Sequence, residues 1–217
     1  MPDNSSSIYP VALNLQGRRC LVVGGGQIAC RKAEGLLQAG ANVTVVAPEV
    51  TRPLRQRENE CCLTIVERAF QPNDVSGMTL IFAATNSPTV NDAVTAAAKE
   101  RNILCSRVDG ISGSDFANMG VVQRGELVIA ISTGGDSPAF TRWVRQQVET
   151  YFGPEYGDFL QLLSMLRKEV LAQVPAEERP DRWARALASE AFPLFCAGDE
   201  DGAIRRLRAE LGLVQST

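Results

Sequence analysis

Three consecutive glycines, Gly24 to Gly26, constrain the fold of this chain more than any other feature of its sequence. They follow an apolar run at residues 19–23 (RCLVV), and a segment with the apolar spacing of a helix begins directly after them. A strand that enters a helix through a tight glycine turn is typical of the first βα unit of an α/β sheet. The sequence therefore predicts strand, turn and helix at the start of such a sheet.

Strands and helices continue to alternate up to residue 118. Gly40 is placed to end the first helix, and the apolar run 43–46 (VTVV) that follows is typical of a parallel strand covered on both faces. Ser87 and Pro88 predict the N-cap and first residue of another helix. Further strands are predicted at 63–66, 79–84 and 103–105, and that second helix at 88–100. The pattern indicates an α/β fold with a Rossmann-type doubly wound parallel sheet over residues 1–118.

The second half of the chain has a different pattern. Residues 126–132 (ELVIAIS) predict a strand, and the glycine-rich turn 132–138 (STGGDSP) leads into a helix that runs to about Tyr151. Helical apolar spacing then recurs in segments 155–174, 180–191 and 199–212. We expect a small α+β region over residues 119–150 and a helical C-terminal domain over residues 151–217.

The glycine turn matches a dinucleotide-binding fingerprint. In Gly24-x-Gly26-x-x-Ala29 the first glycine forms the turn, and the second lets a pyrophosphate approach the backbone. Backbone N–H groups of Gln27 and Ile28 at the helix start then face the phosphate. The motif alone is weak evidence, and a turn that serves only packing is the alternative. Its place between two apolar strands favours a cofactor site.

The second strand is followed by Ala47, Pro48 and Glu49, where such folds carry an acidic residue for the adenosine ribose. Because Glu49 comes slightly late, two interpretations stay open. Either its carboxylate binds the ribose, or the backbone of Pro48 and Glu49 flanks the adenosine. We predict NAD rather than NADP, and we add Thr85, which follows the fourth strand, to the predicted cofactor contacts.

Asp109 is the candidate catalytic residue. It follows the fifth strand, at the carboxyl edge of the sheet where open α/β folds bind ligands. The alternative is a turn-forming aspartate before Gly110. The chain has no histidine, so any proton transfer must use a carboxylate, hydroxyl, lysine or water.

Composition excludes several classes of protein. The 217 residues carry a net charge of −3 with a pI near 5.2, which argues against nucleic acid as the main partner. The six cysteines show no paired spacing, so neither a zinc site nor a disulfide framework is expected. A secretory signal and an apolar run of about 18 residues are both missing from the sequence. We expect a cytoplasmic protein with no membrane or metal site.

Several segments together resemble one family. They are YPVALNLQGRRCLVVGGGQIACRKAEGLLQAGANVTVVAPEV, FAATN, CSRVDG and IAISTGGDSPAFTRWVRQQVE. With these segments the chain resembles the precorrin-2 dehydrogenases, which form the N-terminal part of bacterial siroheme synthase and also occur as free-standing proteins. The resemblance is close over residues 8–150 and loose in the helical tail. The pair VVGGGxIAxRK and IAISTGGxSP is more specific than the glycine motif.

The resemblance implies NAD-dependent oxidation of precorrin-2 to sirohydrochlorin and, in some members, insertion of ferrous iron to give siroheme. It also implies a homodimer formed through residues 119–150. A methyltransferase module is not expected in a chain of this length, so another protein would supply the tetrapyrrole substrate. By position, the family's NAD contacts correspond to Gln27, Ile28, Pro48 and Glu49, and its essential aspartate corresponds to Asp109.

The tetrapyrrole carries many carboxylates, so its site needs cations and exposed N–H groups. The predicted substrate-binding residues are Arg107, Ser132, Thr133, Gly134 and Arg142, although a solvated surface role suits each arginine equally well. Asp109 would then accept the proton that accompanies hydride transfer, or position the substrate. Two departures from the family concern Thr133, where serine is usual, and residues 115–120 (DFANMG), which are less apolar than usual.

One alternative belongs to another class. The chain could be a non-catalytic NAD-sensing Rossmann regulatory module whose helical tail binds a partner. That hypothesis predicts NAD binding without turnover and no effect of Asp109→Ala.

Overall fold

The computed structural model describes residues 9–60, 62–110 and 113–214. They form two compact units, Met1–Asn118 and Met119–Thr217, which are described separately. Outside the described residues lie the first eight residues, in which no secretory signal was expected, together with Cys61, residues 111–112 and residues 215–217.

The first unit is built on a five-stranded parallel sheet with the order β3-β2-β1-β4-β5. The strands are β1 (Arg19–Val23), β2 (Asn42–Val46), β3 (Leu63–Val66), β4 (Leu80–Ala83) and β5 (Leu104–Arg107). Val23 at the end of β1 is level with Val46 of β2 and Ala83 of β4, so the carboxyl ends of the central strands meet at one edge. This sheet confirms the predicted α/β, Rossmann-type fold.

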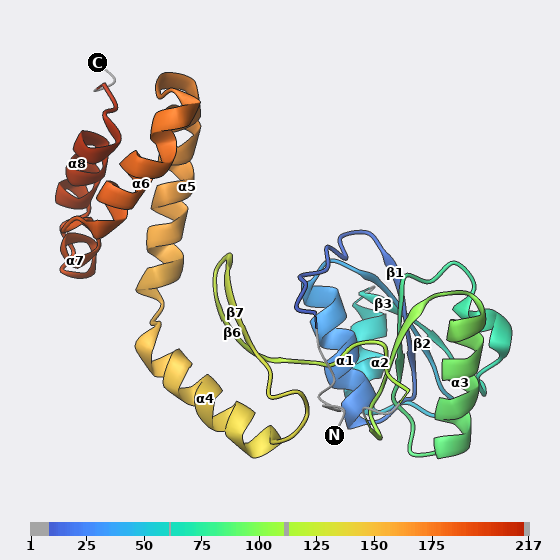
Figure 1. The fold of residues 1–217 in the computed structure, drawn as a ribbon. Coiled ribbons are helices and arrows are strands. Elements are labelled where there is room, and N and C mark those ends of the chain that lie inside the picture. Colours follow the sequence, from blue (N-terminus) through green and yellow to red (C-terminus); the bar gives the residue numbers. More distant parts are fainter. Residues whose placement is uncertain (1–8, 61, 111–112, 215–217) are drawn as a thin grey trace, which may run out of the picture. The chain divides into compact units, whose positions relative to one another are not determined.

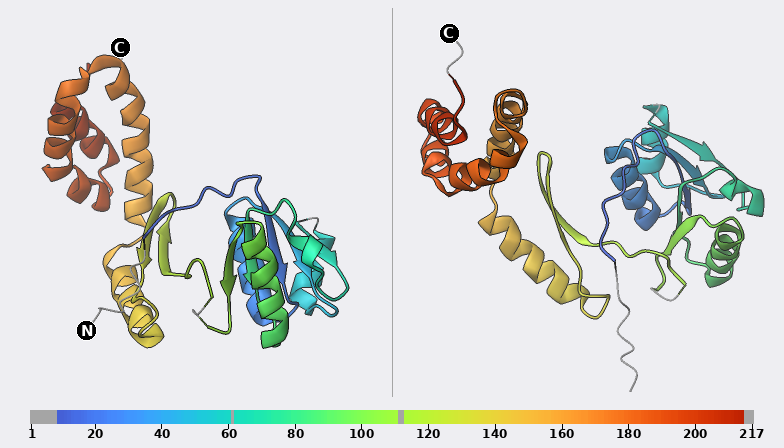
Figure 2. Two further views of the ribbon diagram at one scale, coloured as in Figure 1. Left: turned by 45° about the vertical axis from the view of Figure 1, so that its right-hand side comes forward. Right: turned by 45° about the horizontal axis from the view of Figure 1, so that its top comes forward.

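Helices cover both faces of this sheet, as Figure 1 shows. They are α1 (Gln27–Gln38), α2 (Arg52–Asn59), α3 (Pro88–Glu100) and the short 3-10 helix η1 (Pro72–Val75). Successive residues of β1 point to opposite faces. Val22 is buried in the core that α1 and α2 cover, and Val23 is buried in the core that α3 and η1 cover. The further views in Figure 2 show the same layering of the first unit.

The helix boundaries follow from local signals that the sequence carries. The Ser87 side chain caps α3 by accepting a hydrogen bond from the Val90 N–H at 3.4 Å. Gly40 ends α1 with a φ of 74°, a left-handed conformation that glycine adopts without strain. Both predicted boundaries are confirmed.

The second unit contains a two-stranded antiparallel hairpin and a series of helices. The elements are β6 (Gly120–Arg124), β7 (Leu127–Ile131), α4 (Pro138–Tyr151), α5 (Glu155–Gln173), η2 (Ala176–Glu178), α6 (Arg179–Ala188), α7 (Ala191–Cys196) and α8 (Glu200–Leu211). Buried leucines and aromatic residues of α5, α7 and α8 share one core. The helical tail is therefore confirmed, and the separate domains 119–150 and 151–217 stay predictions.

Several elements differ from the sequence prediction, which also lacked helix α2 and the two short 3-10 helices. Strand β6 was missed, and it pairs with β7 through a turn in which Gly125 has a φ of 56°. The single helix predicted at 180–191 is two helices, because the Ser189 hydroxyl bonds the Ala186 carbonyl and the Ala191 N–H and so interrupts the helix. Strand β5 ends at Arg107 rather than at residue 105.

Within the residues that the structure describes, no helix combines the length and apolar character needed to cross a membrane.

Candidate functional site

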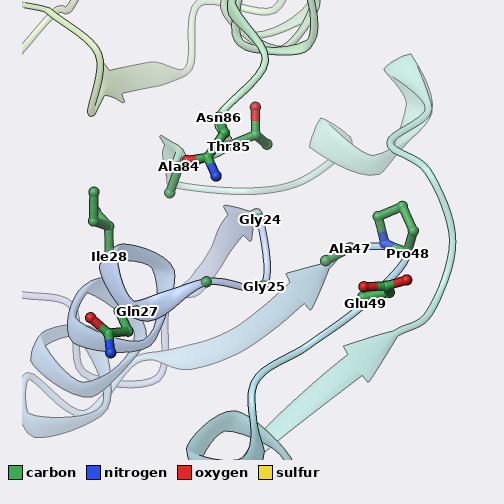
Figure 3. A pocket seen from close by; sticks show the side chains of 11 residues that line it. Gly24, Gly25, Gln27, Ile28, Ala47, Pro48, Glu49, Ala84, Thr85 and Asn86 are labelled. Atoms are coloured by element: carbon green, nitrogen blue, oxygen red, sulfur yellow. The ribbon is translucent and has the colours of Figure 1, made fainter.

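A pocket of about 490 Å³ lies at the carboxyl edge of the sheet, beside β1 and β4. In this strand order the chain changes direction between β1 and β4, which is the place where open α/β sheets bind ligands. Three segments line the pocket, at residues 24–28, 47–49 and 84–86 (Figure 3). All seven predicted cofactor contacts are among its lining residues: Gly24, Gly26, Gln27, Ile28, Pro48, Glu49 and Thr85. Sequence reasoning did not include the other four lining residues among the contacts: Gly25, Ala47, Ala84 and Asn86.

Each of the three positions in the turn requires or permits glycine for a different structural reason. Gly24 has a φ of 128°, and a Cβ atom there would lie 2.2 Å from the Ala84 carbonyl oxygen. A Cβ on Gly25 would lie 1.8 Å from the carbonyl oxygen of Glu49. A Cβ on Gly26 would meet nothing within 4 Å. The first two glycines therefore permit close packing, and the third leaves open space beside the pocket.

This open space fits the diphosphate of a dinucleotide. Gly26 is the N-cap of α1 and provides no side-chain cap for the N–H groups of the first turn. Such groups have no partner within their own helix, and with the helix dipole they attract an anion. The backbone that would hold a diphosphate is thus both accessible and of the right charge.

Pro48 and Glu49 lie across the glycine turn from Gln27 and Ile28 (Figure 3). Their segment is tied to the turn, because the Thr51 N–H donates to the Gly25 carbonyl at 2.9 Å. The side chain of Glu49 is exposed at the pocket. Its carboxylate can therefore accept hydrogen bonds from ribose hydroxyls, although it comes three residues after the end of β2.

Asp109 lies two residues beyond β5, next to the 84–86 segment of the pocket. The backbone joins the two places, because the Val108 N–H donates to the Ala83 carbonyl at 3.1 Å. Arg107 donates from Nε and from a terminal nitrogen to the two carboxylate oxygens of Asp109, each at 2.9 Å. The Asp109 side chain is 26% exposed, so it stays accessible at this edge.

The Arg107 guanidinium sets the charge of Asp109. It holds the pKa of the Asp109 carboxyl well below its usual range, and the Asn91 amide adds to this effect. Asp109 is therefore ionised at neutral pH. A proton acceptor works best when its pKa is near the working pH, so this carboxylate is a weak general base. Of the two roles predicted for Asp109, proton acceptance and substrate positioning, its charge state favours positioning.

Arg107 also contacts Asp92 on α3, which gives its guanidinium two carboxylate partners. Its predicted role as a cation for substrate carboxylates stays a prediction. Its charge is balanced within the chain, and it lies in β5 where it orients Asp109. A local sequence prediction could not foresee this pairing, because Asp92 is 15 residues away.

The turn before α4 was predicted to offer free N–H groups to the substrate. In the structure much of this capacity is used within the turn. The Gly134 N–H donates to the Ser132 hydroxyl, and the Ser137 N–H donates to the Thr133 hydroxyl. Arg142 on α4 is exposed. Substrate contacts by Ser132, Thr133, Gly134 and Arg142 stay predictions.

In the described ranges no three histidine, cysteine or acidic side chains come together as a metal site.

Comparisons with known proteins place these features in a family. A family model described as putative NAD(P)-binding matches residues 11–119, which is half of the chain. A second model, described as sirohaem biosynthesis protein central, matches residues 124–151. The two matches together cover the glycine turn, Asp109, β7 and α4.

Curated relatives and a solved structure agree with these models. The siroheme synthase of Thioalkalivibrio sulfidiphilus (strain HL-EbGR7) is 34% identical over 94% of this chain and 42% of its own length. That of Pseudomonas paraeruginosa (strain DSM 24068 / PA7) is 36% identical over 93% of this chain and 44% of its own length. The chain thus spans less than half the length of these relatives. The structure of SirC, a precorrin-2 dehydrogenase, matches 93% of this chain and 100% of its own, with a TM-score of 0.79 and 27% identity.

Proposed function

This chain belongs to the NAD(P)-binding family of the siroheme synthases and SirC, and we propose that it oxidises precorrin-2 to sirohydrochlorin with NAD as the hydride acceptor. One observation carries the proposal. An open glycine turn suited to a diphosphate follows β1, and an ionised carboxylate, Asp109, follows β5, on either side of β4 at the same edge of the sheet. A dehydrogenase needs this combination of a cofactor cradle and a charged group beside the reacting ring.

The chain's own residues account for binding and charge. Gly26 and the first N–H groups of α1 hold the diphosphate, and Glu49 accepts hydrogen bonds from the ribose. NAD, when bound, supplies the acceptor for the hydride. Loss of hydride leaves positive charge on the tetrapyrrole, and the ionised Asp109 stabilises that charge. Water then takes the accompanying proton, since Asp109 is a weak base.

We extend the proposal to the substrate contacts and the cellular setting. Ser132, Thr133, Gly134 and Arg142 bind carboxylates of the tetrapyrrole, and the chain works in the cytoplasm. Ferrous iron, where it is inserted, is a substrate of the chain.

We also propose a homodimer that covers the hairpin and α4. Helix α4 has no buried residue, although one of its faces is apolar. Phe140 and Trp143 stack on that face with their ring centroids 5.7 Å apart, and both are exposed. Val121 and Val128 of the hairpin are exposed as well. Exposed apolar side chains of this kind are typical of a protein interface.

Trp143→Glu is expected to convert the dimer to a monomer, because it places a charge among apolar side chains at the interface. Sedimentation velocity at micromolar concentration measures the change. Leu187→Glu is the matched control, since Leu187 on α6 and Trp143 are both 55% exposed. A monomeric wild type, or dissociation of both variants alike, would contradict the proposed interface.

Glu49→Gln is expected to weaken NAD binding about fivefold and to strengthen NADP binding, because the carboxylate accepts from the ribose and repels a 2′-phosphate. Titration calorimetry with each dinucleotide checks both directions. Glu100→Gln at the exposed end of α3 removes an equal charge far from the ribose end of the pocket and should change neither affinity. Unchanged selectivity in Glu49→Gln would assign the ribose contact to the backbone of Pro48 and Glu49 instead.

An anaerobic assay with precorrin-2 and NAD tests the function. We expect sirohydrochlorin and NADH to appear together, and addition of ferrous iron then reports any chelatase step. NAD binding without product would favour the non-catalytic sensing module.

A further inference from the structure

Asn91 has an unusual place among the polar residues of the first unit. It lies in the first part of α3 and is fully buried, at 0% exposure. Burying an amide is costly unless its hydrogen bonds are satisfied. The partners of Asn91 therefore indicate why an amide occupies this position.

Three hydrogen bonds join the Asn91 side chain to Thr85, a residue of the pocket, and the same amide also lowers the pKa of Asp109. Its Oδ1 accepts from the Thr85 N–H at 3.2 Å and from the Thr85 hydroxyl at 2.8 Å. Its Nδ2 donates to the Thr85 carbonyl at 3.1 Å. The amide thus fixes both backbone groups and the side chain of Thr85.

Thr85 links these hydrogen bonds to the cofactor pocket. It lines the pocket directly after Ala84, whose carbonyl oxygen packs against Gly24. The pocket is built from the glycine turn on one side and the 84–86 segment on the other. A shift of Thr85 would therefore change the width of the pocket.

The next residue of α3 reaches the candidate catalytic group. Asp92 contacts Arg107, and Arg107 binds both carboxylate oxygens of Asp109. Two consecutive residues of α3 thus position Thr85 at the pocket wall and the ion pair of Arg107 with Asp109. Because a helix is stiff, these two sets of contacts fix the distance between Thr85 and the Arg107–Asp109 pair.

We propose that Asn91 and Asp92 are positioning residues: Asn91 holds Thr85 against the cofactor, and Asp92 aligns Arg107 and Asp109 with the same pocket. The inference rests on the proposed function for its kinetic part only. The part that concerns Asn91 and Thr85 is tested by NAD binding without any tetrapyrrole.

The first test compares NAD affinities by titration calorimetry. Asn91→Ser removes the amide and should raise the Kd for NAD about tenfold, and Thr85→Val, which loses only the hydroxyl, should raise it about threefold. The control is Thr95→Val, since the Thr95 hydroxyl bonds the backbone carbonyl of Asn91 at 2.8 Å and does not touch Thr85. Wild-type affinity in Asn91→Ser would overturn the proposal, as would an equal loss in Thr95→Val. If Asn91→Ser does not fold, wild-type affinity in Thr85→Val would overturn it.

The second test separates kcat from KM. Asp92→Asn should lower kcat about fivefold and leave the KM for NAD unchanged, and Asp92→Glu should restore part of the loss because it keeps the charge. Wild-type kcat in Asp92→Asn, or an equal loss in Asp92→Glu, would overturn the link to Asp109. If the wild type binds NAD but turns over no precorrin-2, the proposed function fails, and the binding test still decides the role of Asn91.

Discussion

Gly26→Ala is expected to weaken NAD binding about tenfold or more, which corresponds to at least about 1.4 kcal/mol. The added methyl group meets no atom of the chain within 4 Å, so it occupies the space that a diphosphate needs. Gly26 has a φ of −83° and a ψ of −172°, which alanine also adopts. The unfolding temperature should therefore change little. Titration calorimetry and thermal unfolding measure the two effects on the same samples.

Gly25→Ala is the matched comparison, because it adds the same methyl group one residue earlier. That methyl would lie 1.8 Å from the Glu49 carbonyl oxygen, so the backbone itself must shift. Overpacking of this kind costs about 1–3 kcal/mol and should lower the unfolding temperature by about 5 °C or more. If Gly26→Ala also unfolds at a lower temperature and binds NAD normally, the glycine turn serves packing alone.

Asp109→Asn is expected to lower kcat about a hundredfold with little change in the Kd for NAD. The substitution keeps the size of the side chain and removes the charge that stabilises the developing cation. Steady-state kinetics with precorrin-2 and NAD measure kcat, and calorimetry measures the Kd. Asp181→Asn in the first turn of α6 removes the same charge elsewhere and should leave kcat unchanged. Wild-type kcat in Asp109→Asn would contradict the assigned role.

The pH dependence of kcat tests whether Arg107 keeps Asp109 ionised. Because the pKa of Asp109 is lowered, the active form persists as the pH falls, and it is lost only below the usual carboxyl range. The wild type should show no loss from this group above about pH 5. In Arg107→Gln the pKa rises toward about 4, so kcat should begin to fall as the pH approaches that value. A wild-type enzyme that loses activity between about pH 7 and 5 would instead indicate a carboxyl with a raised pKa.

Sequence patterns predict the parts of this protein that local chemistry determines. The glycine turn, the apolar strands, the cap at Ser87 and the end of α1 at Gly40 each depend on a few adjacent residues. Strand β6 was missed because its pairing with β7, rather than its own composition, makes it a strand. Two interactions join different elements: the ion pair of Arg107 with Asp92, and the hydrogen bonds between Asn91 and Thr85. Neither could be inferred from sequence spacing.

The candidate site likewise combines features that the sequence predicts with features that only the fold determines. The predicted cofactor contacts line one pocket because the parallel sheet brings the ends of β1, β2 and β4 together. The charge state of Asp109 depends on its hydrogen bonds with Arg107, which the sequence does not reveal. Of the two predicted roles, proton acceptance and substrate positioning, this charge state favours positioning.

The most direct test of the proposed function traces the hydrogen that is transferred from precorrin-2 to NAD. Precorrin-2 deuterated at the carbon that gives up the hydride is incubated anaerobically with the wild-type protein and NAD, and the reduced dinucleotide is analysed by mass spectrometry. Direct hydride transfer in this pocket predicts deuterium in the reduced dinucleotide, in step with sirohydrochlorin formation. Reduced dinucleotide that lacks deuterium, or sirohydrochlorin formed without reduced dinucleotide, would contradict it.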